Sequence, residues 1–274
     1  MTLTSDLGNA YTAQVKAVLS RSVDPGRLVD LAHDLPAQGI AEAAFVLRAM
    51  ARGFPRGTVH LVVVDPGVGG HRAPIVIACR EGSFLVGPDN GVLYPLAEDL
   101  GIRRAYRIDP GPRTGRRHVG TTFDGRDLFA PAVARLARGV APSRLGRPHV
   151  PHVYRIPRAE PGVDAARGEV VHADHFGNLI TNVPSEWVPE AVRRLTVTVG
   201  RGPARTVPRT TSYEALGAGR LGVLGSSFGT LEVAVDRGRA DQRLRAKVGT
   251  PVRLRWRHAP RVRALPENTG PHRK

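Results

Sequence analysis

The sequence predicts an α/β fold, with an N-terminal, mostly parallel sheet flanked by helices and a smaller C-terminal domain that is mainly β. Two observations predict this class. In the first half of the chain, apolar runs of strand length alternate with segments whose apolar residues recur at helical spacing. In the last hundred residues the apolar runs stay short, are separated by Gly and Pro, and show little helical periodicity.

The elements of the first domain follow from these patterns in chain order. Ile40, Ala44, Leu47 and Ala51 recur at helical spacing. The run Thr58–Val64 is almost continuously apolar, which is typical of a strand buried on both faces. The expected elements are strands over Met1–Ser5, Leu28–Leu31, Thr58–Val64, Ile75–Cys79 and Phe84–Val86, and helices over Ala10–Leu19, Ile40–Ala51, Gly91–Leu100 and Gly125–Arg138.

A proline-rich stretch separates the two expected domains. We assign residues 1–141 to the α/β domain, 142–166 to a connector, 167–258 to the β domain and 259–274 to a basic, frayed tail. In the β domain, short apolar runs predict strands over Gly168–His172, Leu179–Asn182, Leu195–Val199, Arg220–Leu224, Leu231–Val235 and Pro251–Arg255.

Composition excludes several classes of protein. The 274 residues suffice to bury a real core, and 41% hydrophobic against 23% charged residues is globular composition. No apolar run approaches the 18 or so residues of a membrane span, and the first residues lack a signal-peptide pattern. Cys79 is the only cysteine, which excludes an internal disulfide and multi-cysteine metal sites. We therefore expect a cytoplasmic protein without a membrane partner.

The net charge of +16 raises the alternative of a nucleic-acid-binding protein. Of the 40 basic residues, 37 are arginines scattered along the whole chain, and aromatic residues make up only 5%. Phosphate-binding sequences usually group their basic residues and interleave them with aromatics. The pattern therefore favours a small-molecule partner over specific nucleic-acid recognition, and salt-dependent binding would test the alternative.

Polar residues follow the apolar strands at several points, where α/β folds place their sites. Asp6 follows the first strand, Asp65 follows the buried strand with Arg72 seven residues later, and Asp124 precedes an expected helix. Helix capping is the structural alternative for Asp6 and Asp124, as is a tight loop for the glycines between Asp65 and Arg72. That loop does not match a dinucleotide fingerprint, because Arg72 stands where the last Gly belongs.

The expected β domain carries two further polar segments. His172–Asn182 includes Asp174, Phe176 and Asn178, and the Ser226-Ser227 turn offers N–H and hydroxyl donors to a carboxylate. Turns alone would account for the Asp, Gly and Asn residues but not for Phe176. The ten histidines show no metal-ligand spacing, so we expect no metal site.

Together these segments resemble the S-adenosyl-L-methionine (SAM) hydrolases that form adenosine, also called SAM hydroxide adenosyltransferases, relatives of the fluorinase and chlorinase. The resemblance runs from about residue 2 to residue 256. Its motifs are Leu3-Thr4-Ser5-Asp6-Leu7-Gly8, Phe54-Pro55-x-Gly57-Thr58-Val59-His60, Val64-Asp65-Pro66-Gly67-Val68-Gly69, Gly87-Pro88-Asp89-Asn90-Gly91, Thr122-Phe123-x-Gly125-Arg126-Asp127, Asp174-x-Phe176-Gly177-Asn178-Leu179-Ile180-Thr181-Asn182 and Leu231-Glu232-Val233-Ala234-Val235. Each motif is weak alone, but seven in register are specific.

The resemblance implies hydrolysis of SAM to adenosine and L-methionine, by in-line attack of water or hydroxide on the ribose C5′ carbon. SAM is then the substrate, and no cofactor or metal is implied. The family implies a homotrimer with SAM bound between neighbouring subunits. The alternative within the same fold is a protein that binds SAM or adenosine but has lost or altered this chemistry.

The family's site residues carry over to particular positions of this chain. Asp65, Arg72 and Asp124 correspond to the group that holds the attacking water, and Asp65 stands where the halogenases have tyrosine. The implied substrate contacts are Asp6 on the ribose hydroxyls, Asn9 on the methionine side, Gln38 in the pocket wall, Asp174 on the methionine ammonium, Phe176 and Asn178 beside the adenine, Ser226 or Ser227 on the methionine carboxylate, and the backbone from Val233 to Val235 at the adenine edge.

This chain departs from the family pattern at three points. Asp124 stands where the hydrolases have His before Gly-Arg-Asp. The loop after Asp6 is shorter, and Asn9 stands where the family usually has an acid. Phe228 lengthens the serine turn by one residue, which leaves open which serine binds the carboxylate.

Overall fold

The computed structural model describes residues 1–33, 35–109 and 122–257 of the chain, so the predicted tail 259–274 lies outside the described residues. The chain divides into two compact units, Met1–Ile156 and Pro157–Lys274, and each is described here by itself. This division falls inside the stretch predicted as a connector. None of the helices in the described part is long and apolar enough to span a bilayer.

The first unit is built on a seven-stranded sheet with the order β2-β1-β3-β5-β4-β6-β7. Five of its strands point the same way, because β2, β1, β3 and β5 pair in parallel and β6 follows an antiparallel β4. The sheet thus confirms the predicted fold class. Its strands are β1 (Thr2–Ser5), β2 (Val29–Ala32), β3 (Val59–Val63), β4 (Pro74–Cys79), β5 (Phe84–Pro88), β6 (Ile102–Ile108) and β7 (Gly146–His149).

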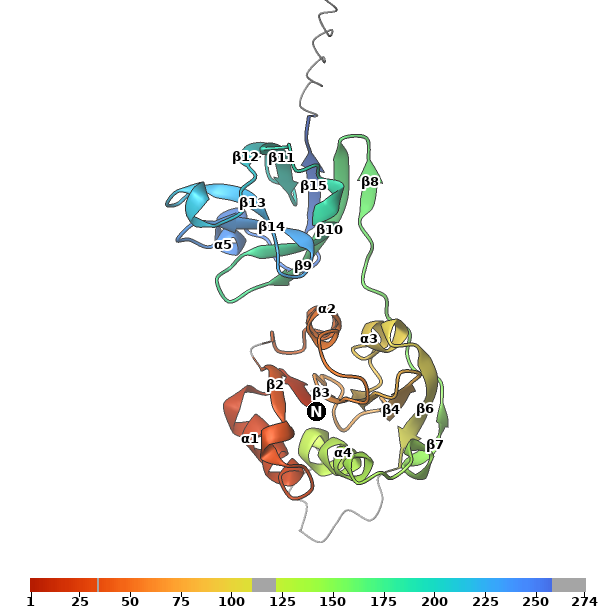
Figure 1. The fold of residues 1–274 in the computed structure, drawn as a ribbon. Coiled ribbons are helices and arrows are strands. Elements are labelled where there is room, and N and C mark those ends of the chain that lie inside the picture. Colours follow the sequence, from red (N-terminus) through yellow and green to blue (C-terminus); the bar gives the residue numbers. More distant parts are fainter. Residues whose placement is uncertain (34, 110–121, 258–274) are drawn as a thin grey trace, which may run out of the picture. The chain divides into compact units, whose positions relative to one another are not determined.

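Helices cover both faces of this sheet (Figure 1): α1 (Gly8–Leu19) and α4 (Ala130–Ala137) pack together on one face, and α2 (Ile40–Ala51) and α3 (Tyr94–Asp99) on the other. Leu3, Leu61 and Val133 are fully buried in the core under α1 and α4. A π-helical turn, η2 (Gly125–Phe129), leads into α4. The sheet and its helices therefore hold the carboxyl ends of β1, β3 and β5 at one rigid edge.

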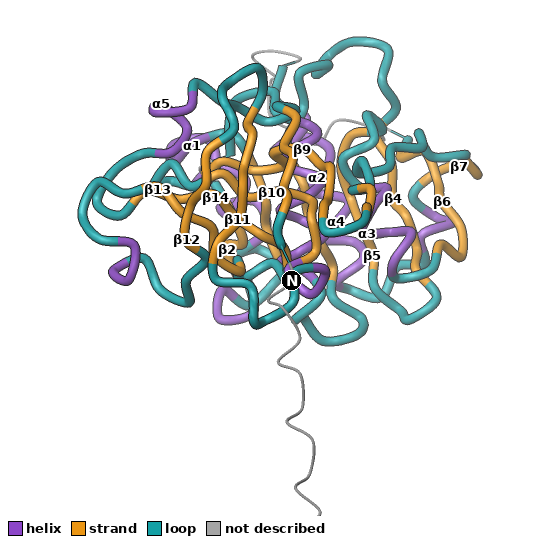
Figure 2. The backbone as a smooth tube through the Cα atoms, turned by 90° about the horizontal axis from the view of Figure 1, so that it is seen from above, coloured by secondary structure: helices purple, strands orange, loops and turns teal. Residues whose placement is uncertain are grey.

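The second unit is an antiparallel β domain with little helix; Figure 2 shows α5 (Ala240–Leu244) as its labelled helix. The first part of β9 pairs with β15 and its last part with β10, so this strand belongs to both halves of the sheet. The strand order is β12-β11-β15-β9-β10-β14-β13, with β8 beside β9. The strands are β8 (Glu160–Gly162), β9 (Ala165–Ala173), β10 (Leu179–Pro184), β11 (Arg194–Val199), β12 (Arg205–Pro208), β13 (Leu221–Gly225), β14 (Thr230–Val235) and β15 (Pro251–Arg255).

The structure adds strands that the sequence patterns did not predict: β6, β7, β8 and β12. β7 and β8 lie within the stretch 142–166 and contain Pro148 and Pro161. Each of the two is an edge strand with a single partner. Edge strands tolerate proline, because the N–H that proline lacks can be one that faces away from the sheet. The helix expected over Gly91–Leu100 is shorter, and the one expected over Gly125–Arg138 begins with the π-helical turn.

Candidate active site

The carboxyl ends of three neighbouring parallel strands place acidic residues along one edge of the first sheet. Asp6 follows β1, Asp65 follows β3 and Asp89 follows β5. Asp89 serves a structural purpose: its carboxylate accepts a hydrogen bond from the His152 backbone N–H at 2.7 Å and lies 2.7 Å from Nε2 of His149. Asp89 is therefore engaged within its own unit, which leaves Asp6 and Asp65 as the candidate site residues at this edge.

Asp65, Arg72 and Asp124 form one hydrogen-bonded cluster. The Arg72 guanidinium donates to both carboxylate oxygens of Asp65, with Nε 2.8 Å from Oδ1, and its Nη2 also donates to Oδ2 of Asp124 at 2.5 Å. The exposed fractions of the three side chains are 6% for Asp65, 11% for Arg72 and 15% for Asp124. The Arg72 guanidinium also lies over the Phe129 ring, 5.6 Å from its centroid. The structure thus brings together the three residues predicted to hold the attacking water.

The charges in this cluster do not cancel. Burial alone would lower the pKa of Arg72, but its hydrogen bonds to Asp65 and Asp124 outweigh this and raise the pKa above the usual value. One guanidinium therefore faces two carboxylates, which leaves one negative charge in excess when both are ionised. Asp65 is held at both oxygens, whereas Oδ1 of Asp124 has no hydrogen-bond partner among the described residues. The free oxygen can accept a proton from a water molecule.

The structure decides against capping as the role of these acids. The N-cap of α1 is Leu7, and no side chain caps that helix. The Asp6 carboxylate instead accepts a hydrogen bond from the Gln38 backbone N–H at 2.9 Å. Asp124 does occupy the N-cap position of η2, but its side chain makes no cap hydrogen bond and pairs with Arg72.

Gln38 and Asn9 are placed differently relative to Asp6. The hydrogen bond from Gln38 ties the loop after β2 to the end of β1, and Gln38 holds a left-handed backbone conformation with φ of 65°. The Ser5 hydroxyl, 2.8 Å from Nδ1 of His33, joins the same two segments. Asn9 lies exposed in the first turn of α1, and its side chain takes part in none of the side-chain hydrogen bonds found among the described residues.

In the second unit, Asp174 and Asn178 form the turn between β9 and β10. Asp174 accepts hydrogen bonds from the Asn178 backbone N–H at 2.8 Å and from its Nδ2 at 2.9 Å. None of the ion pairs among the described residues neutralises Asp174. Gly177, with φ of 82°, lets the chain reverse between Phe176 and Asn178.

A pocket of about 540 Å³ opens beside this turn. Its lining includes three residues predicted to contact substrate, Phe176, Asn178 and Val235. Tyr213, Arg237, Gly238 and Arg239 also line it. The Phe176 ring is 72% exposed, which is unusual for a large apolar side chain and suits a surface that a planar ligand covers. Val233 is 1% exposed and packs in the domain core, so only its backbone could meet a ligand.

Tyr213 is a site residue that the sequence reasoning missed. It stands in a polar stretch without any motif, and only the fold brings it to the pocket beside Phe176. Its hydroxyl donates to Oε1 of the buried Glu232 at 2.6 Å. Burial raises the pKa of Glu232, and the nearby charge of Asp174 adds to this rise, whereas the bond from Tyr213 opposes it. Burial also raises the pKa of Tyr213, so its hydroxyl keeps its proton.

The two serines of the turn between β13 and β14 differ in what their hydroxyls do. The Ser226 hydroxyl accepts a hydrogen bond from the Phe228 backbone N–H at 3.3 Å and lies 3.1 Å from the Thr230 hydroxyl. The Ser227 side chain is exposed, and none of the hydrogen bonds among the described residues involves it. The extra residue of the turn, Phe228, packs its ring against His172 at 6.0 Å, edge to face. Ser227 is therefore the serine whose hydroxyl is free for a ligand.

No group of three or more His, Cys, Asp or Glu side chains that could hold a metal ion occurs within the described ranges. The polar groups at these candidate positions are acids, one buried guanidinium, hydroxyls and an amide. They suit a substrate that carries hydroxyl groups, an ammonium group and a carboxylate.

The first unit has three layers, with helices on both faces of its sheet and an acid–arginine–acid cluster at the strand ends, and the β domain that follows in the chain carries an aromatic pocket. Such a combination is typical of a two-domain enzyme that acts on a small polar substrate. The family model "SAM hydroxide adenosyltransferase N-terminal domain" matches residues 1–146, and the corresponding C-terminal domain model matches residues 168–253. The chain belongs to the SAM hydroxide adenosyltransferase family.

Curated and solved relatives agree with this assignment. The chain is 42% identical to an (R)-S-adenosyl-L-methionine hydrolase of Thermus thermophilus, over 91% of this chain and 97% of the relative. It is 36% identical to a protein of the same name from Salinispora tropica, over 93% and 97% of the two chains. A crystal structure of an uncharacterized conserved protein from Thermotoga maritima superposes with a TM-score of 0.82 at 31% identity, covering 92% of this chain and 98% of that one.

Proposed function

We propose that this protein hydrolyses SAM to adenosine and L-methionine. The observation that carries the proposal is the cluster of Asp65, Arg72 and Asp124, which keeps an uncompensated carboxylate at the edge of the sheet. Family membership and the names of the relatives support the substrate. Because those names specify the R configuration, we expect the R epimer at the sulfonium to be the better substrate.

The proposed reaction is an in-line displacement at C5′ of the ribose. The oxygen of a water molecule forms the new bond to C5′ while the C5′–S bond breaks, and the bonding electrons leave with sulfur, which becomes the neutral thioether of methionine. Oδ1 of Asp124 accepts the water proton and later releases it to solvent. Arg72 stays charged and fixes both carboxylates around the water, so that catalysis rests on positioning and proton transfer.

The negative cluster also selects the nucleophile. A halide ion approaching the excess negative charge of Asp65 and Asp124 is repelled, whereas a neutral water molecule can donate a hydrogen bond to it. The proposal therefore includes turnover that does not depend on chloride. It likewise requires no metal or added cofactor, because the leaving group is already activated by the positive sulfonium.

The substrate contacts are proposed at the positions that the family resemblance implies. Asp6 would hold the ribose hydroxyls, with Gln38 in the pocket wall and Asn9 facing the methionine side. In the second unit, Asp174 would bind the methionine ammonium, Phe176 and Asn178 the adenine, and the backbone from Val233 to Val235 the adenine edge. Ser227 rather than Ser226 would bind the methionine carboxylate, because the Ser226 hydroxyl is used within its own turn.

The family resemblance leads us to propose a homotrimer that binds SAM between neighbouring subunits and acts in the cytoplasm. Light scattering on the purified chain tests the oligomeric state: a mass three times the 29.5 kDa of one chain is expected, and a monomeric mass contradicts this part of the proposal.

The reaction is tested by incubating the protein with each sulfonium epimer of SAM and following adenosine and methionine by chromatography, with and without chloride. Equal amounts of the two products, unaffected by chloride, are expected. A thermal shift with SAM or adenosine but no products would instead support the alternative that Asp124 in place of the family His leaves a binding protein without this chemistry.

A further inference from the structure

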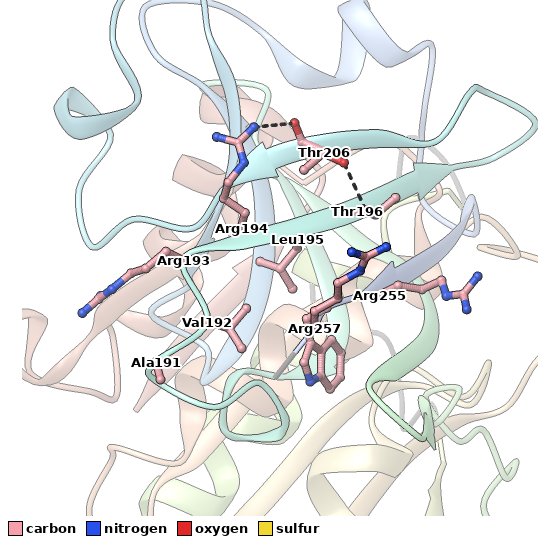
Figure 3. A pocket seen from close by; sticks show the side chains of 10 residues that line it. Ala191, Val192, Arg193, Arg194, Leu195, Thr196, Thr206, Arg255 and Arg257 are labelled. Atoms are coloured by element: carbon pink, nitrogen blue, oxygen red, sulfur yellow. Dashed lines mark hydrogen bonds between the residues drawn. The ribbon is translucent and has the colours of Figure 1, made fainter. Parts of the chain in front are cut away.

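The second unit has a groove of about 710 Å³ that shares no lining residue with the pocket beside Phe176. Four arginines stand around it, as Figure 3 shows: Arg193, Arg194, Arg255 and Arg257. The hydroxyls of Thr196 and Thr206 lie between them, 3.2 Å apart. Nothing in the proposed hydrolysis uses these residues.

The fold gathers these arginines from two separate parts of the sequence. β11 and β15 are antiparallel neighbours, and Thr196 is in register with Arg255. Because side chains alternate along a strand, Leu195, Val252 and Leu254 point into the core, while the arginines between and beside them are exposed. Arginines that are scattered in the sequence thus lie together on one face of the second unit.

The positive charge of this surface is unbalanced. None of the ion pairs among the described residues involves the four arginines of the groove. The positive face continues across β15 to β9, where Arg253 stands directly opposite Arg167, and Glu160 on β8 opposes Arg167 in turn. Like charges placed opposite each other in a sheet cost stability, and Glu160 faces only one of these two arginines, so a bound anion would relieve the repulsion that is left.

We propose that this groove binds the phosphate backbone of double-stranded nucleic acid without reading its sequence. Arginine and threonine side chains are the usual donors to phosphate oxygens, and a positive face that extends over three neighbouring strands fits a polymer better than a compact anion. The chain's net charge of +16 would draw such a polymer to the protein over long distances.

The lining also argues against two other occupants. Trp256, the aromatic side chain of the groove, is only 9% exposed, so no ring is available to stack on the unpaired bases of a single strand. Val192 and Leu195 are 4% and 1% exposed, so the groove presents no apolar side chain for insertion into a lipid surface. A duplex, whose phosphates face outward and whose bases are paired, needs neither.

The test is fluorescence anisotropy of a labelled 20-base-pair DNA duplex with the full-length protein in 50–200 mM KCl. Four arginine–phosphate contacts predict a slope of log affinity against log salt of about −3 to −4, which is about a 100-fold loss over this fourfold range. The variant with Arg193, Arg194, Arg255 and Arg257 all changed to Gln should bind more weakly and lose about this much of the slope. Its turnover of SAM should stay within about twofold of wild type, which also shows that it is folded.

The matched control removes the same charge from the other unit. Arg103, Arg104, Arg107 and Arg147 on β6 and β7 are exposed and, within the described part of the chain, form no ion pair. Changing these four to Gln should leave the salt slope intact. Equal losses in both variants would mean that net charge alone drives binding and would overturn the proposal. So would the absence of binding at 50 mM KCl, or binding to phosphatidylserine vesicles but not to the duplex.

Discussion

Replacing Asp124 by Asn isolates the carboxylate that we assign as proton acceptor. The amide oxygen can still accept the hydrogen bond that Nη2 of Arg72 now gives to Oδ2 of Asp124, so the cluster keeps its geometry. What changes is the charge: one guanidinium then faces one carboxylate, and no group is left to take the water proton. Loss of general base catalysis lowers kcat by about 10²- to 10⁴-fold, or about 3–5 kcal/mol in the activation barrier.

The assay is steady-state formation of adenosine from SAM, with kcat and KM determined separately. KM should change little, because the proposal places Asp124 beside the attacking water and gives it no contact with SAM. Asp99→Asn is the matched control, since it also removes an arginine-paired carboxylate but lies on α3 at the ion pair with Arg48. Asp124→His, which restores the family residue, should keep substantial turnover. A folded Asp124→Asn protein with kcat within threefold of wild type would refute the assignment of Asp124.

Three further predictions follow from single side chains. Ser227→Ala should raise KM for SAM about tenfold with little change in kcat, through loss of a charge-assisted hydrogen bond, whereas Ser226→Ala should act mainly on the melting temperature; the reverse pattern would mean that the wrong serine was chosen. Burial lowers the pKa of His60 to about 4, so as the pH falls the imidazole is protonated in the unfolded chain before it is protonated in the folded protein. The folded state therefore has its full stability above about pH 6.5 and loses about 3 kcal/mol of unfolding free energy between that pH and pH 4. Urea unfolding of wild type and His60→Gln checks this, and parallel pH profiles would contradict it. Burial raises the pKa of Cys79 to about 12, so a thiol reagent at pH 8 should modify it only after unfolding; rapid labelling of the native protein would show that its strand opens.

The sequence patterns predicted the strands and helices whose burial gives a clear apolar pattern, such as a strand that is buried along its whole length. β3 is buried along almost its whole length, so its almost continuous apolar run identified it and placed Asp65 just after its end. β6 was missed because its exposed positions carry Arg103, Arg104 and Arg107, and only Ala105 and Ile108 are buried. A strand with so few buried positions gives neither alternation nor a continuous apolar run.

The site was predictable from the residues only in part. Asp6 and Asp65 could be placed at strand ends, but the bond between Arg72 and Asp124 spans 52 positions in the sequence, and only the family resemblance grouped them beforehand. The choice between Ser226 and Ser227 depended on hydrogen bonds within a turn, and Tyr213 reaches its pocket through tertiary packing. The arginine groove was invisible for the same reason, since strand pairing assembles it.

The way the proposed catalytic cluster is assembled bears on how such enzymes can diversify. Asp65 and Arg72 lie seven positions apart on one loop and bind each other at two points, so this pair holds its shape by itself. The third member comes from a distant segment and touches the pair through a single hydrogen bond. A substitution at position 124 would therefore change the chemistry at the proposed water site while Asp65 and Arg72 stay bound to each other. Single mutations can therefore place an acid, an imidazole or a neutral group at position 124 while the rest of the cluster stays intact.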